Sequence, residues 1–211
     1  MSYIGQKPAD KALVASDLDP AVITGQTALA VAPADTDEFL ISDAGTLKRI
    51  DASLVGGGGI TEADMYRLTA DSADSDVTPL TAWERVDDAT FSKMGTGISV
   101  SSGIFSFPST GLYFVKANCA MKTTTTFDNL RLRGTNDNFS SNDDEIATKI
   151  YGTGSSGNPY QTQILETFFN CTNVSTHKVK LNFHASSALD IKGDTNHNET
   201  TMMFIRLGDS Q

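Results

Sequence analysis

The chain has 211 residues, enough for one domain of ordinary size together with an appendage. Its 26 acidic residues outnumber its 16 basic ones, and the formal charge of −10 argues against nucleic acid as a partner, because phosphate binding needs a basic patch. No apolar run approaches the roughly 20 residues of a membrane span, and the first residues lack the apolar stretch of a secretory signal.

Small polar residues are abundant and predict a chain that is nearly all β. Threonine favours strands, whereas asparagine, aspartate and glycine favour turns. Long periodic runs of helix-forming residues are missing. The one short segment with helical character, residues 10–18, ends at Asp19-Pro20.

Four consecutive glycines at 56–59 divide the chain into two parts. We expect an N-terminal segment over 1–55, a glycine-rich linker over 56–63 and a C-terminal domain over 64–211, because a glycine run of this kind is flexible. The N-terminal segment is poor in large apolar residues, and chains this small usually need a partner to fold.

One element of the N-terminal segment is predicted directly from its sequence. Residues 38–42 and 46–51 form two short runs with apolar residues, separated by Asp43-Ala44-Gly45. This pattern predicts a β-hairpin in which Gly45 occupies a position of positive φ.

The C-terminal domain contains successive strand-like segments separated by polar turns. The candidate strands are 65–70, 98–102, 104–107, 112–121, 130–133, 146–151, 161–171, 178–185 and 201–207. Several alternate apolar and polar residues, as in Val179, Leu181 and Phe183 against the polar side chains between them. This arrangement predicts a β-sandwich or a jelly roll.

Some of these strands are apolar on both faces, namely 112–115, 168–169 and 202–205. One face of each can fill the core, but the outer face of an antiparallel sandwich is normally in water. Doubly apolar strands therefore indicate a protein–protein contact surface. The alternative is that a loop of the same chain crosses each strand.

A spaced set of glycine, aromatic and proline residues begins at Gly103 and ends at the strand that follows Gly111. Its members are Gly103, Phe105, Pro108, Gly111, Tyr113 and Val115. The spacing resembles the signature of the globular head shared by complement C1q and tumour necrosis factor relatives, over roughly residues 64–211. That resemblance implies a ten-stranded jelly roll assembled as a tight trimer about a three-fold axis.

The resemblance also implies roles for individual residues. Phe105 and Tyr113 would lie in the core. The side chains expected at the trimer interface are Leu112, Phe114, Phe168 and Met203. The alternation within 202–205 alone leaves open which of Met203 and Phe204 faces the axis.

The N-terminal part is similar to a different group of proteins. Residues 34–51 and the opening residues 1–8 look like segments of fibre and appendage proteins of tailed phages. The collagen stalk of complement relatives is absent, because glycines before Gly56 occur only at 5, 25 and 45. The phage resemblance implies a virion anchor in residues 1–55, with candidate contacts at Tyr3, Ile4, Phe39 and Ile41.

Candidate metal and catalytic groups do not form a convincing set. Acidic and amide clusters at 71–76, 136–138 and 143–145 do not fit the twelve-residue calcium loop, and are read as solvated turns. The three histidines are far apart, and no converging partners for acid–base chemistry are evident. We therefore expect no catalytic, cofactor or metal site, with calcium binding by the loop acids as the alternative.

Cys119 and Cys171 fall on apolar faces of strands, where a disulfide across the sandwich is geometrically conceivable. Buried free thiols are the expectation for a protein that matures in a reducing cytoplasm. Trp83 could stack on a sugar, but a lone tryptophan beside a strand more often packs against the core.

These features together predict a non-enzymatic structural protein of a tailed-phage virion, made in the host cytoplasm. It would be a homotrimeric tail fibre, attached by residues 1–55 and displaying loops 136–145, 152–160 and 192–199 to a host receptor. The alternatives are a capsid head fibre or decoration protein and, in another class, an extracellular recognition ligand of the complement or tumour-necrosis type. A glycan depolymerase would need paired carboxylates in a groove.

Overall fold

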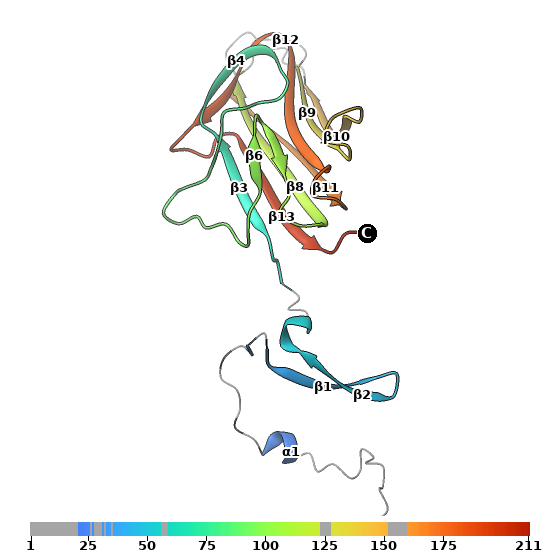
Figure 1. Cartoon of the computed structure of the whole chain (residues 1–211). Coiled ribbons are helices and arrows are strands. Elements are labelled where there is room, and N and C mark those ends of the chain that lie inside the picture. The colour runs from blue at the N-terminus through green and yellow to red at the C-terminus, as the bar shows by residue number, and fades with distance from the viewer. Residues whose placement is uncertain are drawn as a thin grey trace, which may run out of the picture. The chain divides into compact units, whose positions relative to one another are not determined.

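The structure is a computed structural model of the chain, and it has two compact units, residues 1–58 and 59–211 (Figure 1). The residues that it describes are 21–25, 27, 31, 33–34, 36–55, 59–122, 128–151 and 160–211. Within these ranges no helix is long enough or apolar enough to cross a membrane.

The N-terminal unit contains the predicted hairpin, formed by β1 (Glu38–Asp43) and β2 (Thr46–Asp51). The two-residue turn between the strands has φ of 49° at Ala44 and 82° at Gly45, as the hairpin turns that match strand twist require. A four-residue helix, α1 (Ala21–Thr24), precedes the hairpin and was not predicted. The helical segment predicted at 10–18 lies outside the described residues.

The hairpin has no core of its own among the residues described. Every residue of β1 is exposed, including Phe39 at 40% and Ile41 at 38%. Ion pairs link its strands at the surface, one of them between Arg49 and Glu38 at 3.1 Å. An isolated two-stranded hairpin of this kind is at best marginally stable in water.

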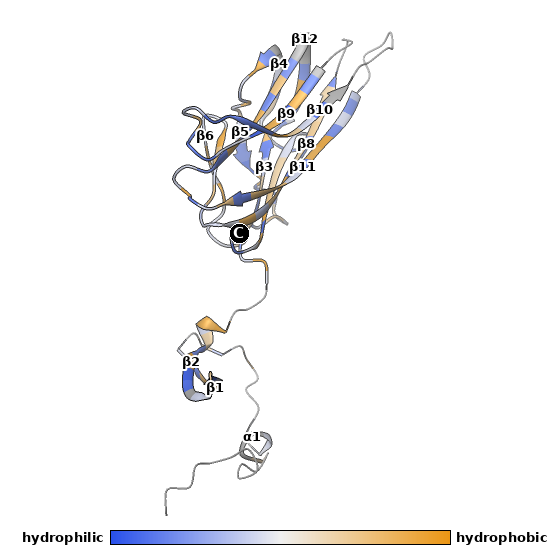
Figure 2. Cartoon of the chain, turned by 90° about the vertical axis from the view of Figure 1, so that its right-hand side faces the viewer, coloured by the Kyte–Doolittle hydropathy of each residue, from blue (hydrophilic) through white to orange (hydrophobic). Residues whose placement is uncertain are grey.

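Five strands of the C-terminal unit form a first antiparallel sheet, named here the β8 sheet, in the order β11-β8-β13-β3-β5. They are β11 (Tyr160–Cys171), β8 (Gly111–Lys122), β13 (Thr201–Gly208), β3 (Ala63–Leu68) and β5 (Trp83–Arg85). Both hydrophobic and polar residues occur along β8 and β11 (Figure 2).

The second layer, named the β12 sheet, has the order β10-β9-β12-β7-β6, with β4 paired to the far half of β12. Its strands are β10 (Asp144–Tyr151), β9 (Asp128–Thr135), β12 (Lys178–Asp194), β7 (Ile104–Ser106), β6 (Ser99–Ser101) and β4 (Ala70–Val77). The layers meet where β12 pairs with β8 at residues 190 and 191. The result is the predicted all-β jelly-roll sandwich.

Aromatic rings fill the space between the two sheets. The Phe105 ring lies 5.2 Å from that of Phe204, and the Phe107 ring lies 5.1 Å from Phe169 and 4.6 Å from Tyr113. Phe105 and Tyr113 are fully buried, as the resemblance implied. Aromatic pairs at these distances stabilise a core beyond the burial of their area.

Strand alternation places the core residues as the sequence pattern predicts. On β8 every second side chain is fully buried: Tyr113, Val115, Ala117, Cys119 and Met121. On β12, Val179, Leu181 and Phe183 are likewise buried. Trp83 packs against Phe105, with its Nε1 donating to the carbonyl of Leu80 at 2.8 Å, which is the packing role expected for it.

The sequence reading was wrong about residues 71–76. They were read as a solvated turn, but they belong to β4, which pairs with β12 from Phe183 to Asp194. An ion pair between Lys192 and Asp71 joins the two strands, and Gly193 N donates to Asp71 Oδ1 at 3.0 Å. Backbone pairing and charge, rather than an apolar face, hold this strand in place.

Candidate functional site

The β8 sheet carries a second apolar surface on the side that faces away from the core. Tyr113 and Val115 point inwards, and therefore Leu112 and Phe114 point outwards. We call this surface the outer face; it comprises Leu112, Phe114, Ile164, Phe168, Met203 and Ile205. The strands that are apolar on both sides thus have one face in the core and the other on the surface.

Strand register aligns three of these side chains in a row across the sheet. Phe168 of β11 stands opposite Phe114 of β8, and Phe114 stands opposite Ile205 of β13. The Phe114 and Phe168 rings lie 6.1 Å apart, and Phe168 is 66% exposed in the single chain. Contiguous apolar surface of this kind marks a contact site, because leaving it in water is unfavourable.

A hollow of about 190 Å³ lies beside this row, over β3 and β13. Its apolar lining includes Ala63 and Met65 from β3, Met203 and Ile205 from β13, and Phe91 from the segment that follows β5. The outer face therefore has both a protruding phenyl ring on an edge strand and an apolar recess. Such a recess can receive apolar side chains of another molecule.

The structure settles which residue of the pair 203–204 points outwards. Phe204 is 1% exposed and lies in the core, whereas Met203 is on the outer face. The four residues expected at a trimer interface, Leu112, Phe114, Phe168 and Met203, thus share one side of one sheet. Their contact with another copy of the chain stays a prediction.

The loop between β9 and β10 is organised by Asp137. Its carboxylate accepts hydrogen bonds from the hydroxyls of Thr135 at 2.8 Å and Ser141 at 2.6 Å, and from the backbone N–H groups of Ser140, Ser141 and Asn142. The hydrogen bonds from Ser141 and Thr135 hold the pKa of Asp137 well below its usual value. Asp137 thus serves the loop itself, as the expected solvated turn does.

The other two loops of the sequence prediction have different outcomes. Residues 152–159 lie outside the described residues, and β12 runs on through 192–194, which leaves only 195–199 as a connection. His184 and His197 are exposed and sit beside Asp76 and Asp194 at 3.5 and 3.2 Å. Within the described ranges, no group of three His, Cys, Asp or Glu side chains is placed to hold a metal ion.

Cys119 and Cys171 are both buried free thiols. Burial raises the pKa of Cys119 to about 12, and burial also raises the pKa of Cys171. A thiol in this state is a poor nucleophile and a poor metal ligand, because both roles need the thiolate.

Comparison with known proteins identifies the fold and nothing more specific. No family model and no curated protein matches the chain. Solved structures do match. Murine APRIL at pH 8.5 gives a TM-score of 0.51 at 15% identity, over 69% of this chain and 98% of that one. The Eiger TNF of S. frugiperda gives a TM-score of 0.56 at 11% identity, over 72% of this chain and 96% of that one. Murine APRIL at pH 5.0 gives a TM-score of 0.52 at 13% identity, over 69% of this chain and 99% of that one.

These likenesses confirm the predicted fold class, a jelly roll of the tumour-necrosis-factor type. At 11–15% identity they bear on the fold alone. The phage resemblance of the N-terminal part, the trimer and the virion anchor stay predictions. Phe39 and Ile41 lie exposed on β1, whereas Tyr3 and Ile4 lie outside the described residues.

Two parts of the outer face were missed from the sequence. Ile205 is the third member of the apolar row, and its place was readable from the alternation that puts Met203 and Ile205 on one side of a strand. The contribution of Phe91 had no such signal, because the sequence of a connecting segment does not indicate which part of the sheet it will cover in the folded chain.

Proposed function

We propose that the protein is a homotrimeric display protein of a tailed-phage particle, with a jelly-roll head for attachment to the host surface. The observation that carries the proposal is the row Phe168, Phe114 and Ile205 on the outer face, because a trimer would cover it. The jelly-roll fold supports the same assembly, because the family resemblance of the sequence implies a trimer.

A head-to-tail contact fits this surface. Phe168 lies on the edge strand β11, whereas the hollow lies over β3 and β13 at the other side of the same sheet. A protruding group on the edge strand and a recess over two interior strands are two different patches that can pair, and such contacts close into a ring when the rotation is 120°. The heads would remain soluble, because a trimer carries close to −30, three times −10.

Display is the mechanism of the proposed function. Three heads held together present three copies of each surface loop, so that a weak contact with the host gains strength through effective concentration. The proposal contains no catalytic step, and neither neighbouring fold, an APRIL and an Eiger TNF, is described as an enzyme.

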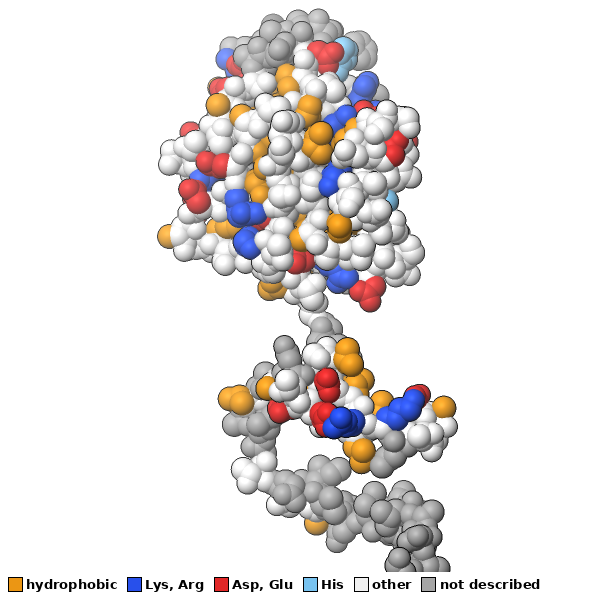
Figure 3. Space-filling model, in the orientation of Figure 1, with side chains coloured by type: hydrophobic (Ala, Val, Ile, Leu, Met, Phe, Trp, Pro, Cys, Tyr) orange, Lys and Arg blue, Asp and Glu red, His pale blue; other side chains and the backbone are white. Residues whose placement is uncertain are grey.

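Residues 1–55 would attach the trimer to the particle, as a tail fibre in our first choice and as a capsid fibre in the second. The exposed hairpin supports this role. Hydrophobic side chains lie on the surface of the N-terminal unit (Figure 3), and Phe39 and Ile41 project from one side of β1. A docking protein would bury them and supply the core that the hairpin lacks.

Particle incorporation tests the proposal. Infected cells would produce either the full chain or a chain that lacks residues 1–55. Phage particles purified from these cells would then be probed with an antibody against residues 59–211. We expect the full chain on the tail or the shell and the shortened chain only in the unbound fraction. Purified particles without the full chain would overturn the virion assignment, and particles that carry the shortened chain would overturn the anchor.

A further inference from the structure

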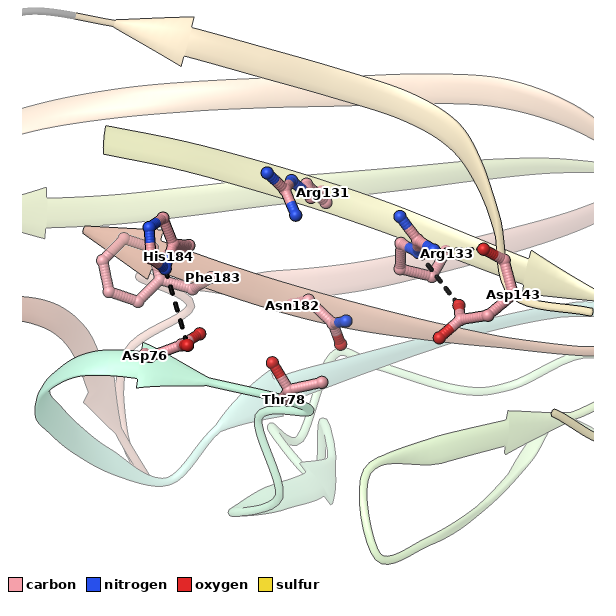
Figure 4. Close-up of a pocket in the computed structure, with 8 residues that line it drawn as sticks. All are labelled: Asp76, Thr78, Arg131, Arg133, Asp143, Asn182, Phe183 and His184. Carbon is pink, nitrogen blue, oxygen red and sulfur yellow. Dashed lines mark hydrogen bonds and ion pairs between the residues drawn. The ribbon is translucent and has the colours of Figure 1, made fainter. Parts of the chain in front are cut away.

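A pocket of about 320 Å³ opens on the outward side of the β12 sheet, the opposite layer from the outer face. Side chains of β9 and β12, the end of β4 and the residue before β10 line it (Figure 4). Small-molecule sites in proteins usually occupy roughly 300–1,000 Å³. The pocket is therefore at the small end of that range, which suits a ligand of the size of one sugar ring.

At one end of the pocket, cationic side chains are bound to Asp143. Arg133 Nε donates to Asp143 Oδ1 at 2.9 Å, and Lys180 Nζ donates to Asp143 Oδ2 at 2.8 Å. Burial alone would raise the pKa of Asp143, but the hydrogen bonds from Lys180 and Arg133 outweigh it and hold that pKa below its ordinary value. Asp143 is thus ionised at neutral pH, and both of its oxygens are occupied.

Arg131 is the cation at this end with a buried donor left over. Its Nε lies 3.2 Å from Glu145 Oε2 as an ion pair, but it makes no hydrogen bond to any residue that the structure describes. Three cationic side chains meet two carboxylates at this end, and Asp76 at the other end of the pocket balances the remaining positive charge. A guanidinium fork of this kind matches the planar geometry of a carboxylate.

Asn182 provides an unused acceptor next to Arg131, which it faces across the β9–β12 ladder. The residue is 8% exposed, and its Oδ1 has no hydrogen-bond partner within the described part of the chain. Figure 4 shows its amide between the two arginines and Thr78. A buried acceptor without a donor is unfavourable, and rotation about the soft terminal torsion of Asn182 lets a ligand hydroxyl satisfy it.

The other end of the pocket is suited to hydroxyl groups. His184 Nδ1 lies 3.5 Å from Asp76 Oδ2, and both side chains are more than half exposed. The hydroxyl of Thr78 lies on the same wall (Figure 4). A carboxylate, an imidazole and a hydroxyl together offer acceptors and donors to the hydroxyls of a sugar ring.

We infer that this pocket binds an acidic sugar residue of the hexuronic type, with its carboxylate on Arg131 and its ring hydroxyls on Asn182, Thr78 and Asp76. A simple anion such as phosphate would use the cationic end alone and leave the hydroxyl-binding wall empty. A neutral sugar would leave the charge of the Arg131 guanidinium unmatched. The combination of both ends selects a ligand that carries a carboxylate and several hydroxyls.

This inference deepens the proposed function, because it names the host-surface chemistry that the head would recognise. Its physical basis is separate, since every residue of the pocket belongs to one protomer. The aromatic rings among the side chains that line the cavity are the imidazole of His184 and the ring of Phe183, which is 1% exposed and turned into the core. Binding to one copy is therefore weak, and display of three copies would strengthen it.

The test is titration of the full-length protein, by calorimetry and ligand-observed NMR, with glucuronate, glucose and inorganic phosphate. We expect glucuronate to bind at least about tenfold more tightly than glucose or phosphate. Arg131→Gln should weaken glucuronate binding by at least about tenfold. The matched control is Arg49→Gln, which removes the same charge from the exposed hairpin of the N-terminal unit and should leave binding unchanged.

A second variant guards against misfolding of the first. Asn182→Ala removes the acceptor but no charge, and should weaken glucuronate and glucose together. Equal binding of glucuronate and glucose, phosphate binding as tight as glucuronate, unchanged binding by Arg131→Gln, or no binding at all would each overturn the inference. Sedimentation of the same samples separates this result from the trimer: a monomer that binds glucuronate contradicts only the assembly, and a trimer that does not bind it contradicts only the pocket.

Discussion

In the loop between β9 and β10, Asp137 is the acceptor around which the backbone folds, with Asn138 and Phe139 both at positive φ. Asp137→Asn replaces one carboxylate oxygen with an amide N–H group, which would face the donors that now bind that oxygen. We expect the variant to have a lower free energy of unfolding at pH 7, measured by urea denaturation.

The pH dependence of this difference follows from the lowered pKa of Asp137. A carboxyl whose folded pKa lies below its unfolded value of about 3.9 contributes stability that is complete above that pH. The contribution is lost as the pH falls through the lower, folded pKa. The gap between the native chain and Asp137→Asn should therefore shrink from pH 7 to pH 3, and a gap of constant size would contradict the assignment.

Other single residues show what the sequence pattern could not predict. Asp64 is buried at 3% exposure, where its carboxylate accepts hydrogen bonds from Arg85 Nε at 3.0 Å and from the backbone N–H of Ile98 at 2.8 Å. Arg67, at 2% exposure, pairs with Glu84 at 2.8 Å. The alternation of apolar and polar residues along a strand suggests that such charged side chains face the solvent. It carries no information about the partners that the folded chain brings to them.

At the scale of elements, the turn from β6 to β7 depends on Gly103. Its φ is 77°, and a Cβ at this position would lie 2.1 Å from the carbonyl oxygen of Leu80. Gly103→Ala should therefore lower the free energy of unfolding by about 2 kcal/mol or more, since it adds a steric clash to an unfavourable backbone conformation.

Gly208→Ala is the matched control for this prediction. A Cβ at Gly208 meets nothing within 4 Å, and the change should stay within about 0.5 kcal/mol. Urea unfolding of both variants gives the comparison. Similar stabilities of the two variants would show that the chain relaxes around Gly103 without strain.

The strands that could be predicted are those with a clear apolar face. All nine segments marked from the sequence in the C-terminal domain correspond to observed strands, with ends displaced by a few residues except in β12, which continues nine residues beyond its predicted end. On β8 the pattern also gave the buried side correctly, because five alternating side chains from Tyr113 to Met121 fill the core. The resemblance carried by the motif from Gly103 to Val115 then implied the jelly-roll architecture.

The strands that were missed lack such a face. The segment Ala70–Val77 is rich in aspartate and serine, and it becomes a strand because β12 extends beyond residue 185 and offers it a backbone ladder. The pocket on the β12 sheet was missed for a related reason. The alternation placed Lys180 and Asn182 on the polar side of the strand, but it did not predict that they are only 7% and 8% exposed, with Asp143 bound to the ammonium of Lys180.

At the scale of the whole molecule, the β8 sheet is the layer that a single chain leaves incomplete. Its inner side is covered by the β12 sheet, whereas its outer face keeps Phe168 at 66% and Ile164 at 47% exposure. A sandwich with only polar residues on its outside would need no further contact. The strand pattern predicted the existence of this apolar outer face but not its shape.

Phe168→Asp tests whether this face joins copies of the chain. A charge placed in a closed interface without a partner is unfavourable by several kcal/mol, and each 1.4 kcal/mol corresponds to a tenfold change in an equilibrium constant. We therefore expect the variant to sediment at about one third of the mass of the native trimer at micromolar concentration. Its thermal unfolding should change little, because Phe168 is largely exposed within one protomer.

Ser175→Asp is the matched control, since it adds the same charge at an exposed position in the turn between β11 and β12. This variant should keep the native mass. It thereby shows whether dissociation depends on where the negative charge is placed or only on the added charge. A Phe168→Asp protein that retains the native mass would remove Phe168 from the interface. A native chain that sediments as a monomer at micromolar concentration would contradict the trimer itself, because the outer face would then be stable in water without a partner.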